Sequence, residues 1–514
     1  MLASPHEPGY GARVSDFEAL YRAVESRDAR WDGRVFVGVT STGIYCRPIC
    51  PVPMPRRENV RFYGNAASAE RAGFRACRRC RPEQSPESPD WDVRADLVGR
   101  ALRLISSGLA DEAGVDGIAR ALAVSPRHLH RIFVRELGVG PAEVARSRRA
   151  GLAKQLLDET DLPSTDIAFA AGFRSLRAYN GALRRSFGRS PTEIRAHRPG
   201  GPGPLADGAV HLRLAYRRPL DLPGLLAFVG ARAIPHVELV EGRSIRRALP
   251  TAGGATLLRL EPAADEDAVE LSVAGHGPGE LAALVQAARR SLDLDADPAT
   301  IDPALGGDPI VGPLVAAAPG RRLPGAFDPW ATTVLAVLAQ GTSLTAARAA
   351  AGRIALAHGP VASVAEPRID RLFPGPAILA GADLSGVGGP ARALVTIGTL
   401  ARRVAEGRLD LEGGGDPERT IEALRTIPGI GPWTAAYVAM RVLRDPDAFP
   451  PGDAAVRAAF RRRGLPADDR SIARAAEAWR PWRGYAVAHL WSPVSGGSGA
   501  TGAGTAALDT PRTA

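Results

Sequence analysis

Four cysteines are grouped near the start of the chain in two short pairs. Cys46 and Cys50 form the first pair, Cys77 and Cys80 form the second, and no cysteine follows among the 514 residues. Two short pairs separated by a loop can place four thiolates around one tetrahedral Zn²⁺. We therefore predict a single zinc site in this segment.

The segment that holds the cysteines is strongly basic. Between Thr42 and Pro82 there are nine arginines against two acids, Glu58 and Glu70. Zinc explains the cysteines but not this excess of positive charge, which predicts a polyanionic partner. The net charge of +10 over the whole chain and the pI near 10.0 favour nucleic acid. A basic cytoplasmic protein with a composition rich in Ala, Gly, Pro and Arg is the plainer alternative.

A second group of residues, near the C-terminus, joins a tight turn to a new helix. Pro428-Gly429-Ile430-Gly431 follows one predicted helix, and Pro432 begins the next. Glycines allow a ligand to approach the backbone closely, and the start of a helix offers free N–H groups. Together they predict a small anion site suited to a DNA phosphate. On spacing alone, an ordinary turn is the alternative.

Aromatic residues make up only 5% of the chain but gather in the same region. Trp433 and Tyr437 are four residues apart and therefore share one helix face. Asp453 follows a kinked Pro-Pro-Gly loop and precedes a predicted helix, where the helix dipole keeps a carboxylate ionised. A helix N-cap is the structural alternative for Asp453, and the two roles are compatible. Four more aromatic residues follow, the first and third of them expected in the core: Trp479, Trp482, Tyr485 and Trp491.

The chain contains a single lysine, Lys154, so a mechanism that needs a lysine nucleophile must use it. Its helix is rich in other charged residues, which predicts a solvated surface position. The region from Arg198 to Ala514 has neither lysine nor cysteine. We therefore expect water as the nucleophile of any chemistry there, and no cysteine-bound iron–sulfur cluster.

The elements that must position these residues fall into several domains. The length suggests about three to four of them. Proline-rich linkers are predicted at Pro82–Pro89 and Arg198–Gly208, and a Gly/Ser-rich tail follows Pro493. We expect a multidomain fold, mainly α with α+β parts. Its predicted domains are 1–85, 92–198, 209–320 and 321–493, with a disordered tail at 494–514.

No signal peptide opens the sequence, and no apolar run of about 18 residues could cross a membrane. We therefore expect a cytoplasmic, nucleoid-associated protein without a membrane partner.

The second predicted domain contains two copies of a helix-turn-helix pattern. In the first, Asp116 to Phe133, Ser125 is the expected N-cap of the second helix, with Pro126 at its first position. The second copy runs from Ser164 to Phe187. Two such units can place two recognition helices in successive major grooves. A plain helical bundle is the alternative.

The third region alternates strands and helices. Period-two runs predict strands at 237–240 and 268–274, with helices at 223–233 and 280–292. From Asp328 onward the pattern is mostly helical.

At these motifs the chain resembles three known families in series. Residues 1–85 are similar to the zinc domain of the Ada adaptive-response proteins, and residues 92–198 to the AraC-type DNA-binding domain. Residues 211–493 resemble the AlkA-type alkylbase DNA glycosylases, which contain a helix-hairpin-helix. The closest motifs are Gly43-Ile-Tyr-Cys-Arg-Pro, Ala72-Gly-Phe-Arg-Ala-Cys-Arg-Arg-Cys, Ala215-Tyr-Arg-Arg-Pro-Leu-Asp and Ile427-Pro-Gly-Ile-Gly-Pro-Trp.

The Ada-like resemblance implies a role for one cysteine. In that family the first cysteine, here Cys46, accepts a methyl group from a backbone methylphosphotriester. Zinc keeps a thiol as the nucleophilic thiolate, but spacing alone does not choose among the four. Methylation of one sulfur would change the charge of the site from −2 to −1 and favour DNA binding. A purely structural zinc is the alternative.

The AlkA-like resemblance implies a catalytic carboxylate at Asp453, which would stabilise the positive charge that develops on the sugar. An alkylated purine is cationic, so electron-rich rings would favour it once it is flipped out of the duplex. The residues that match the substrate-binding positions are Trp433, Tyr437, Trp491, Phe228 and Gln340. The DNA-binding residues are expected to be Pro428, Gly429, Gly431, Arg47, Arg127, Arg131, Arg174 and Arg177.

The sequence departs from these families at two places. Gly341 stands where the glycosylase family places a leucine that wedges into DNA, and a glycine cannot fill the gap left by a flipped base. No Pro-Cys-His-Arg pattern is present, so the alkylguanine-repair domain of Ada proteins is not expected.

We therefore predict a monofunctional glycosylase of the 3-methyladenine type that acts on alkylated double-stranded DNA and carries a methyl-accepting zinc domain. The alternative is a methylation-responsive transcriptional activator, with RNA polymerase as partner and little or no glycosylase activity.

Overall fold

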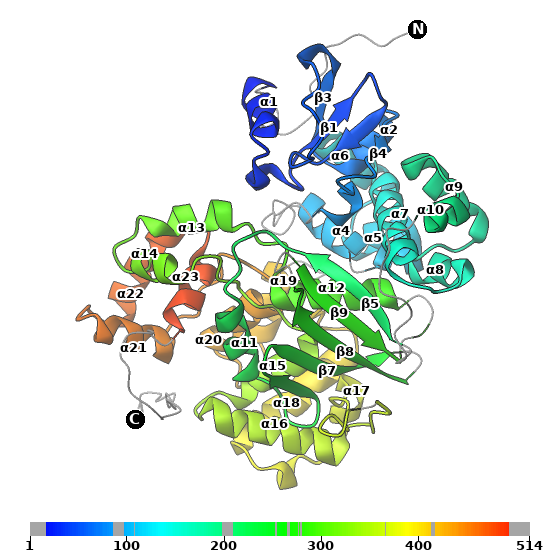
Figure 1. Ribbon diagram of the computed structural model, residues 1–514. Helices are drawn as coiled ribbons and strands as arrows, with labels where there is room; N and C mark the ends of the chain where they lie inside the picture. Colours follow the sequence, from blue (N-terminus) through cyan, green and yellow to red (C-terminus); the bar gives the residue numbers. More distant parts are fainter. Residues whose placement is uncertain are drawn as a thin grey trace. The chain divides into compact units, whose positions relative to one another are not determined.

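The computed structural model describes ten segments of the chain (Figure 1): residues 17–85, 97–106, 108–197, 209–251, 254–264, 268–275, 277, 280–364, 366–412 and 417–492. The chain divides into two compact units. One contains Met1–Arg217 and Gly277–Gln286, and the other contains Arg218–His276 and Ala287–Ala514. Helices predominate and two small sheets accompany them, which confirms the predicted fold class. The predicted linker Arg198–Gly208 and the tail 494–514 lie outside the described residues.

The N-terminal unit begins with helix α1 (Phe17–Glu25) and a four-stranded sheet of order β3-β1-β2-β4. Strands β2 and β4 pair in parallel, with Tyr45 opposite Ala76. Parallel strands end at the same edge of a sheet, so Cys46 and Cys77 come close together. The other elements of this part are η1 (Ala29–Trp31), β1 (Phe36–Val39), β2 (Ile44–Cys46), η2 (Arg57–Asn59), β3 (Val60–Tyr63), α2 (Ala66–Arg71), β4 (Arg75–Ala76) and η3 (Pro82–Gln84).

The helical part of this unit contains both predicted helix-turn-helix copies. Ser125 caps α6 by accepting a hydrogen bond from the amide of His128, as predicted, and Pro126 is the first helical residue. Ser175 caps α9 in the same way. The helices are α4 (Leu97–Ser106), α5 (Leu109–Ala121), α6 (Pro126–Leu137), α7 (Pro141–Glu159), α8 (Ser164–Ala170), α9 (Leu176–Phe187) and α10 (Pro191–Ala196), followed by β5 (Val210–Ala215).

One prediction about this unit is wrong, and the described start of a predicted linker, Pro82–Pro89, is ordered. The segment predicted as a linker begins as the ordered turn η3, in which Pro82 is buried. Lys154, predicted to be solvated at the surface, is buried. Its ammonium lies 2.8 Å from the Glu83 carboxylate and 2.6 Å from that of Asp158. Arg81 pairs with the same aspartate. The only lysine therefore ties the end of the cysteine-rich segment to α7 and is not a solvated surface group.

We expect Lys154→Met to destabilise the N-terminal unit by about 3 kcal/mol, because it removes the cation that faces the buried Glu83 carboxylate and leaves Asp158 with Arg81 alone of its two basic partners. Arg135→Met is the matched control, since Arg135 pairs with Glu136 at the surface and its side chain is 71% exposed. The measurement is the urea dependence of hydrogen exchange in α7. Equal effects of the two substitutions would contradict a stabilising role for the buried pair.

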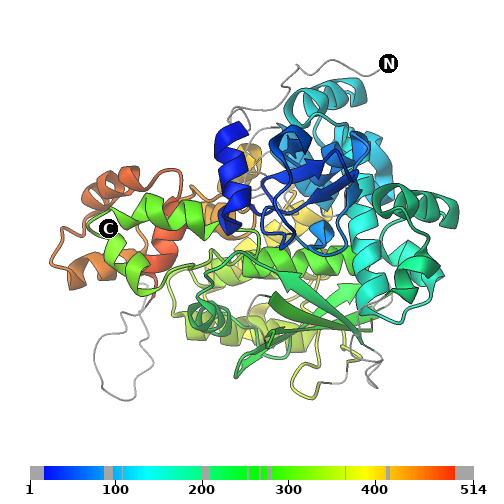
Figure 2. The same cartoon turned by 45° about the horizontal axis from the view of Figure 1, so that its top comes forward.

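The C-terminal unit combines an antiparallel sheet with a helical body (Figure 2). Its strands lie in the order β9-β8-β7-β6, and the predicted strand at 268–274 is confirmed. The predicted strand at 237–240 lies one residue further on, and the predicted helices at 223–233 and 280–292 are α11 and α12. The elements from residue 222 to 292 are α11 (Leu222–Gly230), β6 (Glu238–Glu241), β7 (Ser244–Thr251), β8 (Gly254–Pro262), β9 (Ala268–Ala274) and α12 (Leu281–Leu292).

The helical body follows, as predicted. Helices α15, α16, α18 and α20 contribute to one apolar core, and Trp479 and Tyr485 are buried, as expected. No helix among the described residues is long and apolar enough to span a membrane. The elements are α13 (Pro298–Gly306), α14 (Gly312–Ala317), α15 (Pro329–Leu338), α16 (Leu344–His358), α17 (Pro376–Leu379), η4 (Ser385–Val387), α18 (Ala391–Ala405), α19 (Pro417–Arg425), α20 (Pro432–Arg441), α21 (Ala454–Arg462), α22 (Asp469–Ala476), η5 (Glu477–Trp479) and α23 (Arg483–Leu490).

Candidate metal centre and candidate active site

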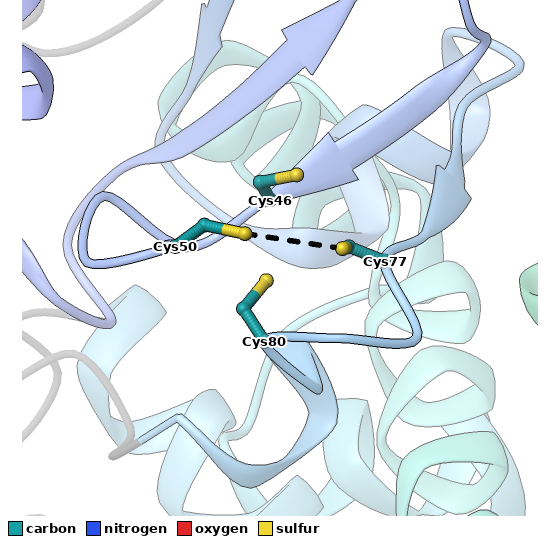
Figure 3. Close-up of side chains that lie close together, drawn as sticks. All are labelled: Cys46, Cys50, Cys77 and Cys80. Carbon is teal, nitrogen blue, oxygen red and sulfur yellow. Dashed lines mark hydrogen bonds between the residues drawn. The ribbon is translucent and has the colours of Figure 1, made fainter. Parts of the chain in front are cut away.

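The four cysteine side chains converge at the edge of the N-terminal sheet (Figure 3). Their sulfur atoms all lie within 4.8 Å of one another, and the Sγ atoms of Cys50 and Cys77 are 4.0 Å apart. Zn–S bonds of 2.3 Å would place the sulfurs of a tetrahedral site about 3.8 Å apart. All four cysteines are buried and unoxidised. The donor set therefore fits one zinc ion with four thiolate ligands.

A backbone amide also contacts one of the four sulfurs. The amide of Arg47 donates to the sulfur of Cys80 at 3.3 Å. A thiolate that accepts a hydrogen bond is less nucleophilic, so this contact makes the Cys80 sulfur less available for reaction.

Arg47, expected to contact DNA, instead makes hydrogen bonds within the protein next to the four cysteines. Its Nε donates to Asp32 at 2.8 Å and its Nη1 to the Cys80 carbonyl at 3.3 Å. Only 15% of its side chain is exposed. This placement favours a role in positioning Cys80, and DNA contact by Arg47 stays a prediction. Seven other arginines of the cysteine-rich segment are exposed: Arg56, Arg57, Arg61, Arg71, Arg75, Arg78 and Arg79.

A half-buried carboxylate lies between the sheet and the helix-turn-helix part. Glu70 accepts hydrogen bonds from Tyr45 at 3.1 Å, Ser147 at 3.2 Å and Ser186 at 3.0 Å. Burial raises the pKa of Glu70, although these hydrogen bonds oppose the shift. Tyr45 precedes Cys46 and Ser186 lies in α9, so the network joins the metal site to the second predicted recognition helix.

The predicted helix-turn-helix arginines are all on the surface. Arg127 and Arg131 lie in α6, and Arg174 and Arg177 lie at the start of α9; each is exposed. An open depression runs along α9, and sequence reasoning missed two of the arginines in it. It is lined by Ser175, Arg177, Ala178, Asn180, Gly181, Arg184 and Arg185.

In the C-terminal unit, the predicted hairpin turn lies between α19 and α20. Gly429 has φ +95°, and a Cβ atom there would lie 2.1 Å from Oγ1 of Thr396. That hydroxyl also donates to the Pro428 carbonyl at 2.9 Å. Only glycine fits this position, and Pro428 and Gly431 are left exposed at the surface. The turn can offer the amides at the start of α20 to an anion.

Asp453 is the N-cap of α21, accepting from the amide of Val456 at 2.9 Å. It also accepts from two indoles, from Trp491 Nε1 at 3.0 Å and from Trp433 Nε1 at 2.8 Å. It is only 5% exposed. The cap role that sequence reasoning left open is thus present, and three donors hold a carboxylate in one orientation beside two aromatic rings.

Four predicted aromatic residues lie together beside this carboxylate. Trp433 stacks on Tyr437 with ring centroids 5.1 Å apart, and Phe228 stacks on Trp491 at 5.8 Å. Tyr437 and Trp491 are 5.9 Å apart. Gln340, the fifth predicted residue, donates to Oγ1 of Thr434, next to Trp433, at 2.6 Å. We call the four rings the aromatic cluster.

Two arginines that sequence reasoning missed lie against the aromatic cluster. The guanidinium of Arg232 is 3.6 Å from the Phe228 ring centroid, and that of Arg441 is 4.6 Å from it. Both donate to Oη of Tyr437, at 3.2 and 2.8 Å. Burial raises the pKa of Tyr437, but the two guanidiniums outweigh it and lower the pKa. Their sequence signal is that each lies four residues after an aromatic one.

Gly341 lies in the turn between α15 and α16, next to Gln340. Its φ is +66°, and nothing lies within 4 Å of where its Cβ would be. The position is exposed. The backbone here is therefore built for glycine, and the turn presents no side chain at this point.

His489 gives the C-terminal unit a pH dependence. Burial lowers its pKa from 6.5 to about 3. The unfolded chain therefore binds a proton more readily below pH 6.5, and stability falls as the pH drops, by about 2 kcal/mol at pH 5. Burial raises the pKa of Asp293 to about 6, which acts in the opposite direction. We expect His489→Gln to abolish the loss of stability that His489 causes at low pH. The measurement is the free energy of unfolding by urea at pH 7 and at pH 5. An unchanged difference would contradict the assignment.

Comparison with known proteins matches most of the chain. The metal binding domain of Ada matches residues 19–83, a helix-turn-helix domain matches 118–197, and the AlkA N-terminal domain matches 211–328. A probable bifunctional transcriptional activator/DNA repair enzyme AlkA of Mycobacterium tuberculosis is 42% identical over 481 residues, which cover 93% of this chain and 97% of the relative. These matches confirm the predicted resemblance.

Two further similarities concern the C-terminal region. DNA-3-methyladenine glycosylase 2 of Escherichia coli is 32% identical over 287 residues, covering 54% of this chain and 95% of that protein. The solved structure of a 3-methyladenine DNA glycosylase from Archaeoglobus fulgidus superimposes with a TM-score of 0.48 at 21% identity, covering 54% of this chain and 96% of that chain.

Proposed function

The chain belongs to the AlkA family of bifunctional transcriptional activators and DNA repair enzymes, and from this premise we propose that its C-terminal unit hydrolyses the N-glycosidic bond of alkylated purines in DNA. The observation that carries the proposal is Asp453. Two indole N–H groups aim its carboxylate beside the aromatic cluster. A base stacked on these rings would leave its sugar near that carboxylate.

The chemistry follows from charge. As the bond between sugar and base breaks, its electron pair leaves with the base and the sugar becomes an oxocarbenium ion. A fixed carboxylate stabilises this cation and orients the water that adds to the sugar, whose proton passes to solvent or to the base. Because no lysine lies in the C-terminal unit, the product is an intact strand with an abasic site.

Base release is the test. Methylated duplex is incubated with the protein, and one portion is trapped with borohydride while another is cleaved with hot alkali. We expect free alkylated base, no trapped protein–DNA adduct, and strand breaks only after alkali. An adduct that maps to the C-terminal unit would overturn the hydrolytic mechanism, and no free base at all would overturn the glycosylase.

For the N-terminal unit, we propose that Cys46 accepts a methyl group from a methylphosphotriester. Bound zinc would keep the cysteines as thiolates at neutral pH. The Cys46 sulfur attacks the methyl carbon, a C–S bond forms as the C–O bond breaks, and the phosphodiester oxygen leaves with the electron pair. Cys46 is proposed as the acceptor because it is the first of the four cysteines, the position that accepts the methyl group in the Ada family that this segment resembles.

We propose further that α6 and α9 bind DNA through their exposed arginines, with RNA polymerase as the partner of any activation. The turn at Gly341 favours a second candidate, a regulator whose glycosylase is weak, because it offers no wedge. Comparison of base release with methylation-dependent transcription separates the two.

A further inference from the structure

The aromatic cluster is not the purely electron-rich surface that a cationic base would require. Phe228 already has two guanidiniums within 5 Å of its ring centroid, at 3.6 Å for Arg232 and 4.6 Å for Arg441. Arg232 is also 5.5 Å from the Trp491 ring. The attraction between a cation and these rings is thus used within the protein itself.

The two arginines are held differently. Arg441 is buried and donates to the carbonyls of Pro324 and Gly325 and to Tyr437, so it is fixed. Arg232 is half-buried, and its recorded acceptors are Oη of Tyr437 at 3.2 Å and the carbonyl of Phe228 at 3.3 Å. Arg232 is therefore less firmly held than Arg441. A base that enters the aromatic cluster would contact the Arg232 guanidinium and could displace it.

The consequence depends on the charge of the base. A base with a full positive charge is repelled by Arg232 and must compete with it for the Phe228 ring. A neutral base suffers no such repulsion, and a guanidinium can donate hydrogen bonds to its carbonyl oxygen or ring nitrogen.

We propose that Arg232 is a specificity-determining residue that shifts excision towards neutral modified bases and away from positively charged ones. The inference rests on the proposed glycosylase function and names the substrate class of the same site. It adds a charged residue to the expectation that electron-rich rings favour a cationic purine.

The test compares two duplexes of the same sequence, one with hypoxanthine as the neutral base and one with 7-methylguanine as the cationic base. Single-turnover release is measured for the parent, Arg232→Met and Arg232→Lys. We expect Arg232→Met to raise the ratio of 7-methylguanine to hypoxanthine release about tenfold. Arg232→Lys keeps the charge and should leave the ratio near that of the parent. Arg243→Met, which removes an exposed arginine in the turn between β6 and β7, controls for net charge on DNA binding.

The possible outcomes distinguish failure of the proposed glycosylase activity from failure of the proposed role of Arg232. Release of neither base by the parent would sink the glycosylase proposal. Release of both bases, with a ratio that Arg232→Met leaves unchanged or lowers, would sink this inference alone. Because the readout is a ratio within one protein, partial loss of folded protein cancels, and Arg232→Gln provides a second uncharged variant.

Discussion

Replacing Asp453 by asparagine is expected to slow base release by about 10²–10³-fold. The change removes the negative charge opposite the developing sugar cation while it keeps the size of the side chain. Binding to damaged DNA should stay within a few-fold of the parent, because the hairpin turn is untouched and the asparagine carbonyl oxygen can still accept from Val456 and Trp491, so that only the Trp433 indole loses its acceptor. Single-turnover release and a DNA-binding isotherm on the same preparation give the two numbers.

The structure supplies a matched control for the capping role. Asp453 and Asp468 both cap helices, by accepting from the amides of Val456 and Ser471 respectively. Asparagine is as good an N-cap as aspartate, so Asp468→Asn should leave both stability and base release unchanged. If Asp453→Asn turned over at a near-normal rate, Asp453 would be a cap only.

Replacing Cys46 by serine is expected to abolish methyl acceptance, the largest effect in the N-terminal unit. A serine hydroxyl is not ionised at neutral pH and is a far weaker nucleophile than a thiolate. The measurement is the mass of the protein after exposure to DNA that carries methylphosphotriesters. A gain of one methyl group by the variant would place the acceptor elsewhere.

The other cysteines should behave differently. Loss of Cys50, Cys77 or Cys80 removes a ligand of the proposed zinc site, so we expect zinc release and unfolding of the cysteine-rich segment. Zinc content and circular dichroism on each variant distinguish this from the loss of a nucleophile. Methyl acceptance by a folded, zinc-containing Cys50→Ser protein would show instead that Cys50 is dispensable for the metal site.

The features that the sequence predicted well are those with local causes. The Ser125 cap depends on residues three apart, and the Gly429 turn depends on a backbone conformation that one residue type tolerates. The cysteine pairs are short, so each pair brings its own two sulfurs together. For these features, residues close together in the chain determine the local conformation, so the pattern of residue types is enough to predict it.

The features that the sequence missed depend on contacts between distant segments. Lys154 lies among charged residues on its helix, yet it is buried and pairs with Glu83, which is 71 positions away in the sequence. Arg232 meets Tyr437 across 205 positions. Residue type and spacing along one helix carry no information about such partners, so the sequence alone predicts a solvated Lys154 and does not reveal that Arg232 lies against the aromatic cluster.

The burial of Lys154 also provides a way to measure how often the surrounding structure opens. An amine-directed reagent finds a single lysine side chain, and that amine is enclosed by two carboxylates at the junction of η3 with α7. Its labelling rate therefore measures how often this junction opens. The labelling rate can be measured before and after methylation of Cys46. A faster rate after methylation would show that chemistry at the metal site weakens the contact between the cysteine-rich segment and the helices that follow it.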